Sequence, residues 1–531
     1  MRNFLKWMVG VQVAGLACVT AAAQLPNCPL RPIAGNVVVD AMSLTSQNGA
    51  LSLALTERNA ADSQGFMHYC FDYATANGDI ESPTLRLNPG DTLTLDLTNQ
   101  LNLVGPGVTG HSHMEGMAVS GSDSTDPCKS QIANLNTTNL HFHGLNVPPK
   151  CHQDDVINTL IQPSKTPFRY QIQIPANEPP GLYWYHPHVH GLTGPPIAGG
   201  ATGAIIVGGL EKIKPQVAGL TERVLIVREQ FPAGGGDELG AQLTLNYQPA
   251  TYPLTAAAII ETKPGEKQFW RVLNSSTNNF LVLQMLIGTT AQSMELISLD
   301  GVPVTGDPTV TSITVPIAGR AEFIITGPPT GATATFVTGG FDTGPIGDSN
   351  PPQLLARVVA TTSPVGTSRQ VEPGVLPAVT QRFAGLAAIK PTTTRVLYFA
   401  EEFSGTNDPP NFFITVDGQQ PKLFKMNERP AITTKVGAVE DWTIQNRTGE
   451  MHAFHMHQIH FLVVAIDGVA VANPTVQDTI QVPYWSGKGP YHSVTLRMDF
   501  RDPNIAGTFM YHCHILDHED NGMMAKIRVD P

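Results

Sequence analysis

The stretch LNPGDTLTLDLTNQ, residues 87–100, recurs in related form at two later places in the chain. These are TKPGEKQFWRVLNSS at residues 262–276 and TKVGAVEDWTIQNRT at residues 434–448. In each copy a glycine is followed by apolar residues at the fifth and seventh positions and by an asparagine at the ninth. A turn followed by apolar residues at every second position indicates a β-strand with one buried face. Because the copies are almost equally spaced, they predict three similar β domains.

The closing asparagines of two copies, Asn274 and Asn446, also fall in N-x-S/T sequences, which are potential glycosylation sites. Because these residues end a strand, a structural role in the following turn is the alternative explanation. Asn136 lies in a third such sequence, outside the repeats. The sequence does not decide whether any of the three is glycosylated.

The chain begins with MRNFLKWMVGVQVAGLACVTAAAQ, which combines Arg2 and Lys6 with a short apolar run and small residues up to Ala23. This pattern is typical of a secretory signal, so we expect residues 1–23 to be removed and the mature chain to be secreted or periplasmic. No later segment is apolar enough to span a bilayer, so we expect no membrane span in the mature chain.

The net charge of -12 and the small number of Lys and Arg residues, 32 in total, argue against nucleic acid as a partner.

Removal of the signal leaves an odd number of cysteines: Cys28, Cys70, Cys128, Cys151 and Cys513. In an oxidising compartment cysteines pair, so one thiol should remain. The other four can pair in three ways that the sequence does not rank, although a bridge from Cys128 to Cys151 would brace the loop that carries His141 and His143. We expect Cys513 to stay unpaired, because it lies in the densest histidine cluster, where a metal would use and protect it.

A second alignment relates the ends of the first and third domains. GLYWYHPH, residues 181–188, matches GTFMYHCH, residues 507–514, with Pro187 in the position of Cys513. Further along, Ala201 stands opposite Met523. The first domain therefore has the histidine pair but lacks the thiol and the thioether. The second domain has no histidines at the corresponding places, so we interpret it as a structural spacer that carries no metal.

Histidines at alternate positions are unusually frequent, since chance would give roughly half of one such pair. The chain has six, counting overlaps: His111/His113, His141/His143, His186/His188, His188/His190, His455/His457 and His512/His514. A single pair of this kind is usually a surface or packed pair. Four of them, however, fall at corresponding places in the first and third domains, as HFHG and HAFHMH after an early strand and as HPH and HCH at the end. This coincidence favours metal ligands.

The HCH segment can serve two sites, because successive side chains on a strand point to opposite faces. His512 and His514 should point one way and Cys513 the other. Cys513 with His518, a further histidine and a weak axial Met523 matches the ligands of an electron-transfer copper. Zinc would favour a closed set of strong ligands without methionine.

The blocks HFHG, HPH, HAFHMH and HCHILDHEDNGMM, in this order and spacing, resemble the four copper-binding segments of the multicopper oxidases. The resemblance implies an all-β fold of three cupredoxin-like Greek-key β-sandwich domains, which we place at residues 24–210, 211–372 and 373–531. It also implies four copper ions, with one type 1 copper in the third domain and a cluster of one type 2 and two type 3 coppers between the first and third domains. Ala453 and Gln458 replace the family's usual proline and glycine, at positions that are not ligands.

The same resemblance assigns the ligands residue by residue. The type 1 copper would be held by His452, Cys513, His518 and Met523. The type 2 copper would be held by His141 and His455. The two type 3 coppers would be held by His143, His186, His188, His457, His512 and His514.

As the resemblance implies, the protein would couple one-electron oxidation of a reducing substrate to the four-electron reduction of dioxygen to water. Electrons would enter near His518 and His452 and pass through Cys513 to its neighbouring histidines. Glu519, and Asp154 or Asp155, resemble the family's acidic residues that relay protons. For either aspartate taken singly, a solvated loop carboxylate is an equally good interpretation.

The preferred donor is a phenol or an aromatic amine, as in a laccase. The segment GHSHMEGM at residues 110–117 supports an alternative, because its His111, His113, Met114 and Met117 are soft ligands that suit Cu(I). The protein would then be a cuprous or other metal-ion oxidase in copper tolerance. A metal-free cupredoxin-like scaffold is a further alternative, against which the complete ligand set argues.

Overall fold

The computed structural model describes residues 28–61, 67–103, 125–130, 133–230, 242–250, 257–363, 369–372, 382–403 and 410–531. The expected signal segment and the His/Met segment at residues 110–117 lie outside this part of the chain. The described part is almost entirely β, and its three α-helices are short: α1 Gly194–Gly199, α2 Leu210–Ile213 and α3 Leu516–Asp520. None of these helices has the length and apolar character needed to cross a bilayer.

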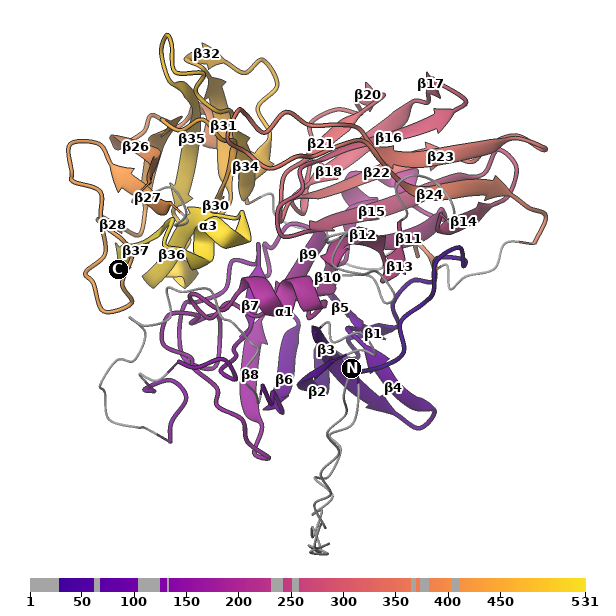
Figure 1. Ribbon diagram of the computed structural model, residues 1–531, viewed down its shortest axis with the longest axis horizontal. Coiled ribbons are helices and arrows are strands. Elements are labelled where there is room, and N and C mark those ends of the chain that lie inside the picture. The colour runs from indigo at the N-terminus through magenta and orange to yellow at the C-terminus, as the bar shows by residue number, and fades with distance from the viewer. Residues whose placement is uncertain are drawn as a thin grey trace, which may run out of the picture.

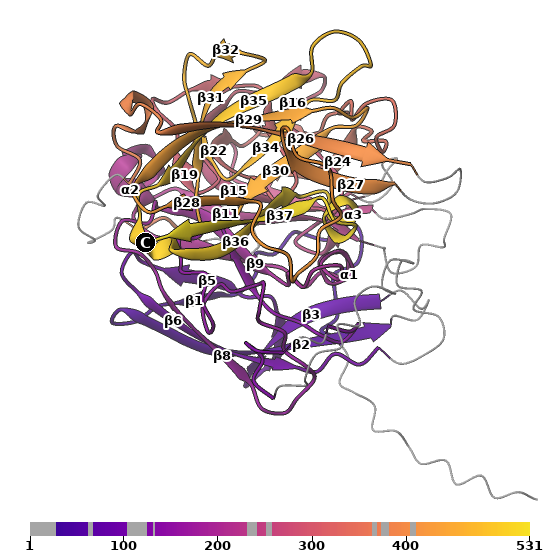
Figure 2. The ribbon, with the colours of Figure 1, turned by 90° about the vertical axis from the view of Figure 1, so that its left-hand side faces the viewer.

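The strands form three sandwiches of two sheets each, from three consecutive stretches of chain. In Figure 1 the first sandwich (indigo to magenta) lies below, the second (pink) at upper right and the third (orange to yellow) at upper left, so that each adjoins the other two. Figure 2 shows the third sandwich above the first. Among the described strands, no sheet combines two sandwiches. The all-β cupredoxin-like fold is thus confirmed, whereas the domain boundaries at residues 210 and 372 stay predictions.

The first sandwich has the sheet orders β1-β5-β10-β9-β7 and β4-β3-β2-β6-β8. Its strands are β1 Ser43–Thr45, β2 Ala50–Ala61, β3 Met67–Thr75, β4 Gly78–Glu81, β5 Thr84–Leu87, β6 Thr92–Asn99, β7 His141–His143, β8 Phe168–Gln173, β9 Gly181–His186 and β10 Gly203–Val207. The third sandwich has the orders β27-β26-β29-β35-β31-β32 and β28-β37-β36-β30-β34. Its strands are β26 Thr393–Glu402, β27 Asn411–Val416, β28 Ile432–Lys435, β29 Ala438–Asn446, β30 His452–Met456, β31 Phe461–Ile466, β32 Val469–Ala470, β33 Val476–Gln477, β34 Thr479–Val482, β35 His492–Phe500, β36 Gly507–Cys513 and β37 Met524–Asp530.

The second sandwich, between them in the chain, has the orders β13-β12-β11-β15-β22-β18-β19 and β14-β24-β23-β16-β17. Its strands are β11 Thr221–Gln230, β12 Gln242–Leu245, β13 Gln248–Pro249, β14 Ile259–Thr262, β15 Lys267–Ser275, β16 Leu281–Ile287, β17 Thr290–Ala291, β18 Met294–Leu299, β19 Val302–Pro303, β20 Thr309–Val310, β21 Ile313–Val315, β22 Arg320–Thr326, β23 Thr333–Thr338, β24 Gln353–Ala360 and β25 Arg369–Gln370. Short 3-10 turns occur at Pro215–Val217, Leu386–Ala388 and Pro503–Ile505.

The three sequence repeats form equivalent strands, β6, β15 and β29. Each pairs in parallel with an earlier strand of its sandwich (β2, β11 or β26) and antiparallel with a later one (β8, β22 or β35). Their alternate apolar residues lie in the three separate cores: Leu95 and Leu97, Trp270 and Val272, Trp442 and Ile444. The repeat therefore marks one position in a common topology.

Strand β15 departs from the prediction of a single buried face, because almost all of its residues are buried. Leu273, on the face opposite the core, packs with Leu182 and Trp184 of the first sandwich. Phe269 packs with Leu210 of the helix between the two sandwiches. The prediction is wrong for this strand because its second face is an interface between sandwiches and not a solvent surface.

The segment that precedes β1 associates with the second sandwich. Val38 lies in the second core, and its N–H donates to the carbonyl of Ile259 at 2.7 Å. Asp40 pairs with Arg223 at 2.9 Å. The start of the predicted first domain thus packs partly on the second.

The asparagine that closes each repeat is buried and ties the end of its strand to another segment. In each copy the Nδ2 amide donates to a distant carbonyl: Asn99 to Ile161 (2.7 Å), Asn274 to Val315 (3.1 Å) and Asn446 to Val482 (3.1 Å). The side-chain oxygen accepts the N–H of the residue two positions later in all three copies. These contacts support the turn role for the two asparagines in N-x-S/T sequences of the repeats.

Two disulfides are present, Cys28–Cys70 and Cys128–Cys151, with Cα–Cα distances of 5.9 and 5.7 Å. The second joins the segments on either side of β7, which carries His141 and His143, as expected for a brace. Cys513 is the free cysteine of the described chain, and it is buried.

We expect Asn446→Asp to lower the free energy of unfolding by about 2 kcal/mol, because a carboxylate cannot donate to the carbonyls of Glu450 and Val482 and both hydrogen bonds are lost. Urea denaturation followed by tryptophan fluorescence measures the effect. Asn473→Asp, at an exposed position, serves as the control and should change stability by less than about 0.5 kcal/mol. Equal effects of the two substitutions would contradict the structural role.

Candidate metal centres

The paired histidines lie on neighbouring strands in two of the sandwiches. In the first sandwich β7 pairs antiparallel with β9, with His141 opposite His186. In the third sandwich β30 pairs antiparallel with β36, with His455 opposite His512. The two sandwiches therefore present the same pair of histidine-bearing strands, as the sequence alignment predicted.

These strands bring eight buried histidines together where the first and third sandwiches meet. Within each of three groups, one ligand atom of every residue lies within 4.8 Å of the others. The groups are His141/His143/His455, His143/His186/His514 and His188/His457/His512. Two ring pairs stack across the interface, His141 on His457 at 3.9 Å and His143 on His455 at 4.0 Å between centroids. The structure thus divides the six predicted type 3 ligands into two sets of three and brings the predicted type 2 pair into the remaining group with His143.

Many ring nitrogens of this cluster lack the hydrogen bonds that buried polar atoms normally make. The buried nitrogens without a partner are Nε2 of His141, His186 and His455, Nδ1 of His143 and His457, and both nitrogens of His514. Burial lowers the pKa of His143 well below its usual value and lowers the pKa of His188 and of His514 to about 3. Neutral imidazoles with free lone pairs are good ligands for copper. The residues of the cluster therefore fit copper ions.

The opposite nitrogens of four of these rings, in His141, His143, His186 and His455, are held by protein oxygens, which fixes the tautomer and the ring orientation. The carboxylate oxygens of Asp154 both lie 3.0 Å from His141 Nδ1. His455 Nδ1 donates to the backbone carbonyl of Asp478 at 2.8 Å. In both residues Nε2 is the nitrogen left without a partner.

Cys513 lies in a second, separate group with His452 and His518. Its Sγ is 3.6 Å from His452 Nδ1 and 3.8 Å from His518 Nδ1, and the two Nδ1 atoms are 3.1 Å apart. Met523 is buried in the same core, and its carbonyl accepts the N–H of Cys513 at 3.0 Å. Two imidazoles and a thiol, with a thioether in the same core, fit an electron-transfer copper. The two faces of β36 therefore serve different groups, as strand alternation predicted.

The surroundings of Cys513 favour its thiolate. Burial alone would raise the pKa of the Cys513 thiol, but hydrogen bonds from His452 and His518 lower it to about 6. Burial would likewise lower the pKa of His518, but Cys513 and Glu450 raise it to about 10. The thiolate is the form that binds a metal, so the group is prepared for one at neutral pH.

The outer nitrogens of the same two histidines face carboxylates. Glu401 Oε1 lies 3.3 Å from His452 Nε2, and Glu450 Oε2 lies 3.4 Å from His518 Nε2. The ring of Phe412 stacks on His518 with centroids 4.1 Å apart. The side chains of His518 and Glu450 are 6% and 11% exposed, so this edge is where the group approaches solvent.

Glu519 lies on α3, directly after the HCH strand, and is fully buried beside the histidine cluster. Its Oε1 is 3.5 Å from His188 Nε2, and its Oε2 is 3.2 Å from His512 Nδ1. Burial alone would raise the pKa of Glu519, but these histidines hold it well below its usual range. Of the three predicted proton-relay residues, Glu519 is the one that contacts two histidines of one ligand group, His188 from the first sandwich and His512 from the third.

The two candidate aspartates have different surroundings. Asp154 contacts His141 and also accepts the N–H of Phe142 at 2.9 Å. Asp155 contacts none of the clustered histidines and instead accepts from Asn158 at 3.0 Å. The structure therefore brings only Asp154 to the candidate site.

Gln458, one of the departures from the family pattern, has a structural use. Its φ of 58° is a left-handed conformation that favours glycine. Its side-chain amide donates to Asp154 Oδ2, and its carbonyl accepts from Asn146 Nδ2 at 2.6 Å. The glutamine therefore links the third sandwich to the carboxylate that orients His141.

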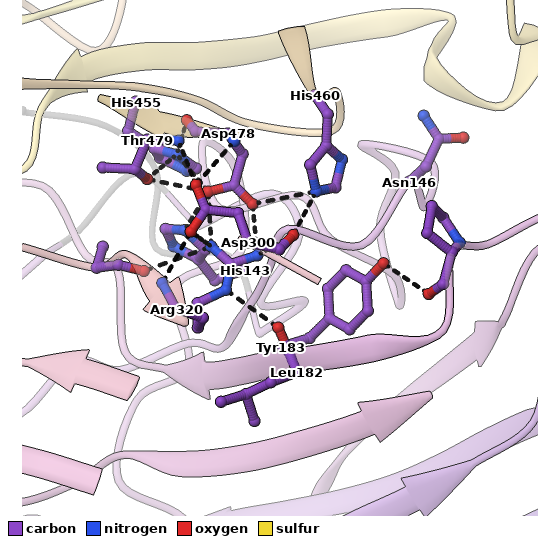
Figure 3. A network of polar contacts seen from close by, with 12 residues as sticks. His143, Asn146, Leu182, Tyr183, Asp300, Arg320, His455, His460, Asp478 and Thr479 are labelled. Atoms are coloured by element: carbon purple, nitrogen blue, oxygen red, sulfur yellow. Dashed lines mark hydrogen bonds and ion pairs between the residues drawn. The ribbon is translucent and has the colours of Figure 1, made fainter. Parts of the chain in front are cut away.

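Sequence reasoning missed the part that the second sandwich plays. Arg320 and Asp300 of this sandwich form a buried network with Asp478 of the third, shown in Figure 3. Asp478 Oδ1 lies 3.2 Å from His143 Nε2. The second sandwich supplies no ligand to the three histidine groups, but it is not merely a spacer. Gly144 of HFHG, whose missing side chain leaves room for Arg320 and Asp478, lies next to this network, but a glycine in the sequence does not indicate an ion pair.

The remaining paired histidines have other positions. His190 lies outside the three groups, with its ring against Phe424 at 4.9 Å between centroids. His111 and His113 lie outside the described residues.

Comparisons with known proteins agree with this geometry. Two family models, both described as multicopper oxidase, match residues 131–212 and 397–531. The multicopper oxidase mco of Staphylococcus haemolyticus is 24% identical over 85% of this chain and 83% of its own length. A laccase of Haloferax volcanii is 32% identical over 20% of this chain and 17% of its own length. The solved structure of a multicopper oxidase from Campylobacter jejuni, described as a metallo-oxidase, has the same fold, with a TM-score of 0.66, 18% identity and coverage of 94% of this chain and 96% of that one.

The two matched segments contain the strands that bring the clustered histidines together. The agreement extends from the sequence to the fold, and the chain contains two multicopper oxidase domains; multicopper oxidases are oxidoreductases that use dioxygen and a reducing substrate.

Proposed function

We propose that the protein is a laccase-like oxidase that couples one-electron oxidation of phenols or aromatic amines to the four-electron reduction of dioxygen to water. When bound, four copper ions would supply the one-electron chemistry at the donor site and the reduction of dioxygen at the cluster. The observation that carries the proposal is that three consecutive residues at the end of β36 belong to three separate groups, Cys513 to one and His512 and His514 to one histidine group each.

The ligands proposed from the sequence fit these groups. His452, Cys513 and His518, with Met523 as a weak axial ligand, would hold the type 1 copper. His141 and His455 would hold the type 2 copper. The type 3 pair would be held by His143, His186 and His514 on one side and by His188, His457 and His512 on the other.

The strand itself joins the two sites. Cys513 is bonded covalently through the backbone to His512 and His514, so a path of roughly 10 Å leads from its sulfur to either ring. The N–H of Cys513 and the carbonyl of Met523 hold this strand against the next. No side chain has to move to complete the path.

The surface around His518 favours an organic donor. Ile346 and Leu423 are 50% and 41% exposed, and they lie against Gly449 and Gly522, the neighbours of Glu450 and Met523. Apolar side chains would contact an aromatic ring, while the Glu450 carboxylate would accept a hydrogen bond from its O–H or N–H group. We therefore prefer a phenol or an aromatic amine to Cu(I).

Oxidation of Cu(I) or another metal ion is the second candidate. The relative from Campylobacter jejuni is described as a metallo-oxidase. The carboxylates of Glu401 and Glu450 beside the Cys513 group could also attract a cation. The soft residues at 110–117, outside the described part, add to this alternative.

Protons for the reduction of dioxygen would be delivered by Glu519, which lies between His188 and His512. Neither of its carboxylate oxygens has a hydrogen-bond donor of ordinary geometry among the described residues. Asp154 would act differently, because it holds His141 in one tautomer. Asp155, which has no contact with the cluster, is the weakest of the three predictions.

We also propose that the protein is exported. The two disulfides support an oxidising compartment, because such bonds persist there and are rare in the cytosol. The N-terminal sequence supports the same proposal.

The copper-loaded protein should be blue, with an orange-red absorption band from the thiolate of Cys513. Cys513→Ser should lose this band, since a hydroxyl does not replace a thiolate ligand, while a type 2 copper signal in electron paramagnetic resonance remains. A colourless wild-type protein after copper loading would instead support the metal-free scaffold.

Glu450→Gln should raise KM for a substituted phenol roughly tenfold, because hydrogen bonds to a charged group contribute about 1.5–3 kcal/mol. Oxygen uptake with the phenol, with Cu(I) and with ferrocyanide, which has no O–H or N–H group, measures this effect. KM for ferrocyanide should not rise. The control is Glu402→Gln, at an exposed position nearby in the chain. Phenol oxidation that needs added copper would favour the metal oxidase.

Glu519→Gln should slow oxygen turnover about 100-fold and leave the blue band intact, because an amide cannot hold and release a proton. Stopped-flow reoxidation of the reduced enzyme separates this step from donor oxidation. Asp517→Asn, at an exposed position of the same helix, is the matched control. Unchanged turnover in Glu519→Gln would rule out the relay.

A further inference from the structure

The guanidinium of Arg320 is fully buried and makes contacts with all three sandwiches (Figure 3). Its Nε donates to the carbonyl of Leu182 in the first sandwich at 3.1 Å. Its Nη1 and Nη2 donate to the two carboxylate oxygens of Asp478 in the third, both at 2.6 Å. The same two nitrogens reach the carbonyls of Ala318 (3.4 Å) and Asp300 (3.0 Å) in the second. All five N–H groups of the side chain are thereby used.

Arg320 pairs with both carboxylate oxygens of Asp478. Asp478 in turn contacts one histidine from each ligand-bearing sandwich. Its Oδ1 lies 3.2 Å from His143 Nε2, and its backbone carbonyl accepts from His455 Nδ1 at 2.8 Å. The opposite nitrogens, His143 Nδ1 and His455 Nε2, have no partner. These two rings are stacked, and they share a ligand group with His141.

The Asp478 carboxylate is also held in place by its surroundings. Asp300 Oδ2 accepts the N–H groups of Asp478 and Thr479, both at 3.2 Å, and Thr479 Oγ1 donates to Asp478 Oδ1 at 2.9 Å. Gly144 makes room for the ion pair, since a Cβ there would lie 2.5 Å from Arg320 Nη2 and 2.7 Å from Asp478 Oδ2. The pair can therefore shift little without moving the backbone around it.

We propose that Arg320 is a positioning residue for the type 2 copper, through which the second sandwich sets the orientation of His143 and His455. The proposal rests on the proposed function, because it assumes a type 2 copper at His141 and His455 and a type 3 copper at the neighbouring His143. The ion pair between Arg320 and Asp478 fixes the carboxylate and the carbonyl to which the two rings are bonded. A domain without copper ligands thus determines the geometry of a copper site formed by the other two.

The substitution Arg320→Lys tests whether the hydrogen bonds of the guanidinium, and not its positive charge alone, position the two histidines. The lysine ammonium keeps the positive charge but has three donors at one point, so it cannot pair with both oxygens of Asp478 and also bond to Leu182. Arg271 provides a matched control in the same sandwich. It is also buried and pairs with Glu222 at 2.5 Å and with Glu322, and it contacts none of the clustered histidines.

The experiment compares the copper-loaded full chain as wild type, Arg320→Lys and Arg271→Lys. The readouts are the type 2 signal in electron paramagnetic resonance relative to the blue band, and the loss of copper to a chelator. Arg320→Lys should release the type 2 copper roughly 10- to 100-fold more readily, with an altered type 2 signal and an intact blue band, because outer contacts contribute this much to metal affinity. Arg271→Lys should retain copper as the wild type does.

Wild-type retention and signal in Arg320→Lys would overturn the proposal, and so would equal copper loss in both variants, which would indicate a general loss of stability. If Arg320→Lys does not fold, Thr479→Val decides, because it keeps the ion pair and removes the hydrogen bond to Asp478 Oδ1 and the 3.2 Å contact of the same hydroxyl with His455 Nδ1. A weaker type 2 site in that variant supports the proposal, and an unchanged one contradicts it. A wild-type protein without a type 2 signal would instead refute the proposed function.

Discussion

The meeting of two histidine-bearing edges, one from the first sandwich and one from the third, is the contact on which the rest of this structure depends. It buries imidazole nitrogens that have no protein partner, which is costly unless something else binds them. The fold limits the cost in two ways: burial lowers the pKa of six of the eight histidines, and Asp154 and the carbonyl of Asp478 occupy the other nitrogens of His141 and His455. The remaining lone pairs converge, and copper ions are well suited to accept them.

Strand β36 adds a second constraint. Because its side chains alternate, it places Cys513 in the hydrophobic core of the third sandwich and the flanking histidines in the interface. In the first sandwich β9 ends at His186, and Pro187 directly after it takes the middle position between His186 and His188, so this segment serves the interface alone. The change from proline to cysteine, together with His452, His518 and Met523 of the third sandwich, therefore separates a domain with one kind of site from a domain with two.

The second sandwich illustrates how a domain without ligands can still shape a metal site. Its strand β15 is buried on both faces because one of them contacts the first sandwich, and Arg320 begins the neighbouring strand β22. The arginine is thereby placed at the junction of all three sandwiches, where its five donors find acceptors from each. The orientation of the ligand histidines is thus coupled to the packing of the whole molecule.

The sequence by itself determined the repeated strands, the division of β36 into two faces, the histidines that cluster and the free Cys513, because these follow from local periodicity and from residue chemistry. It left the cysteine pairing and the choice between Asp154 and Asp155 open, and it gave no sign that Arg320 or Asp478 lies near the histidines. Only the tertiary structure decided these points. The cysteine pairs and the contact of Asp154 with His141 depend on how the loops of the first sandwich pack. The positions of Arg320 and Asp478 depend on which faces of separate sandwiches meet, because that packing makes neighbours of residues more than a hundred positions apart that no pattern along the chain connects.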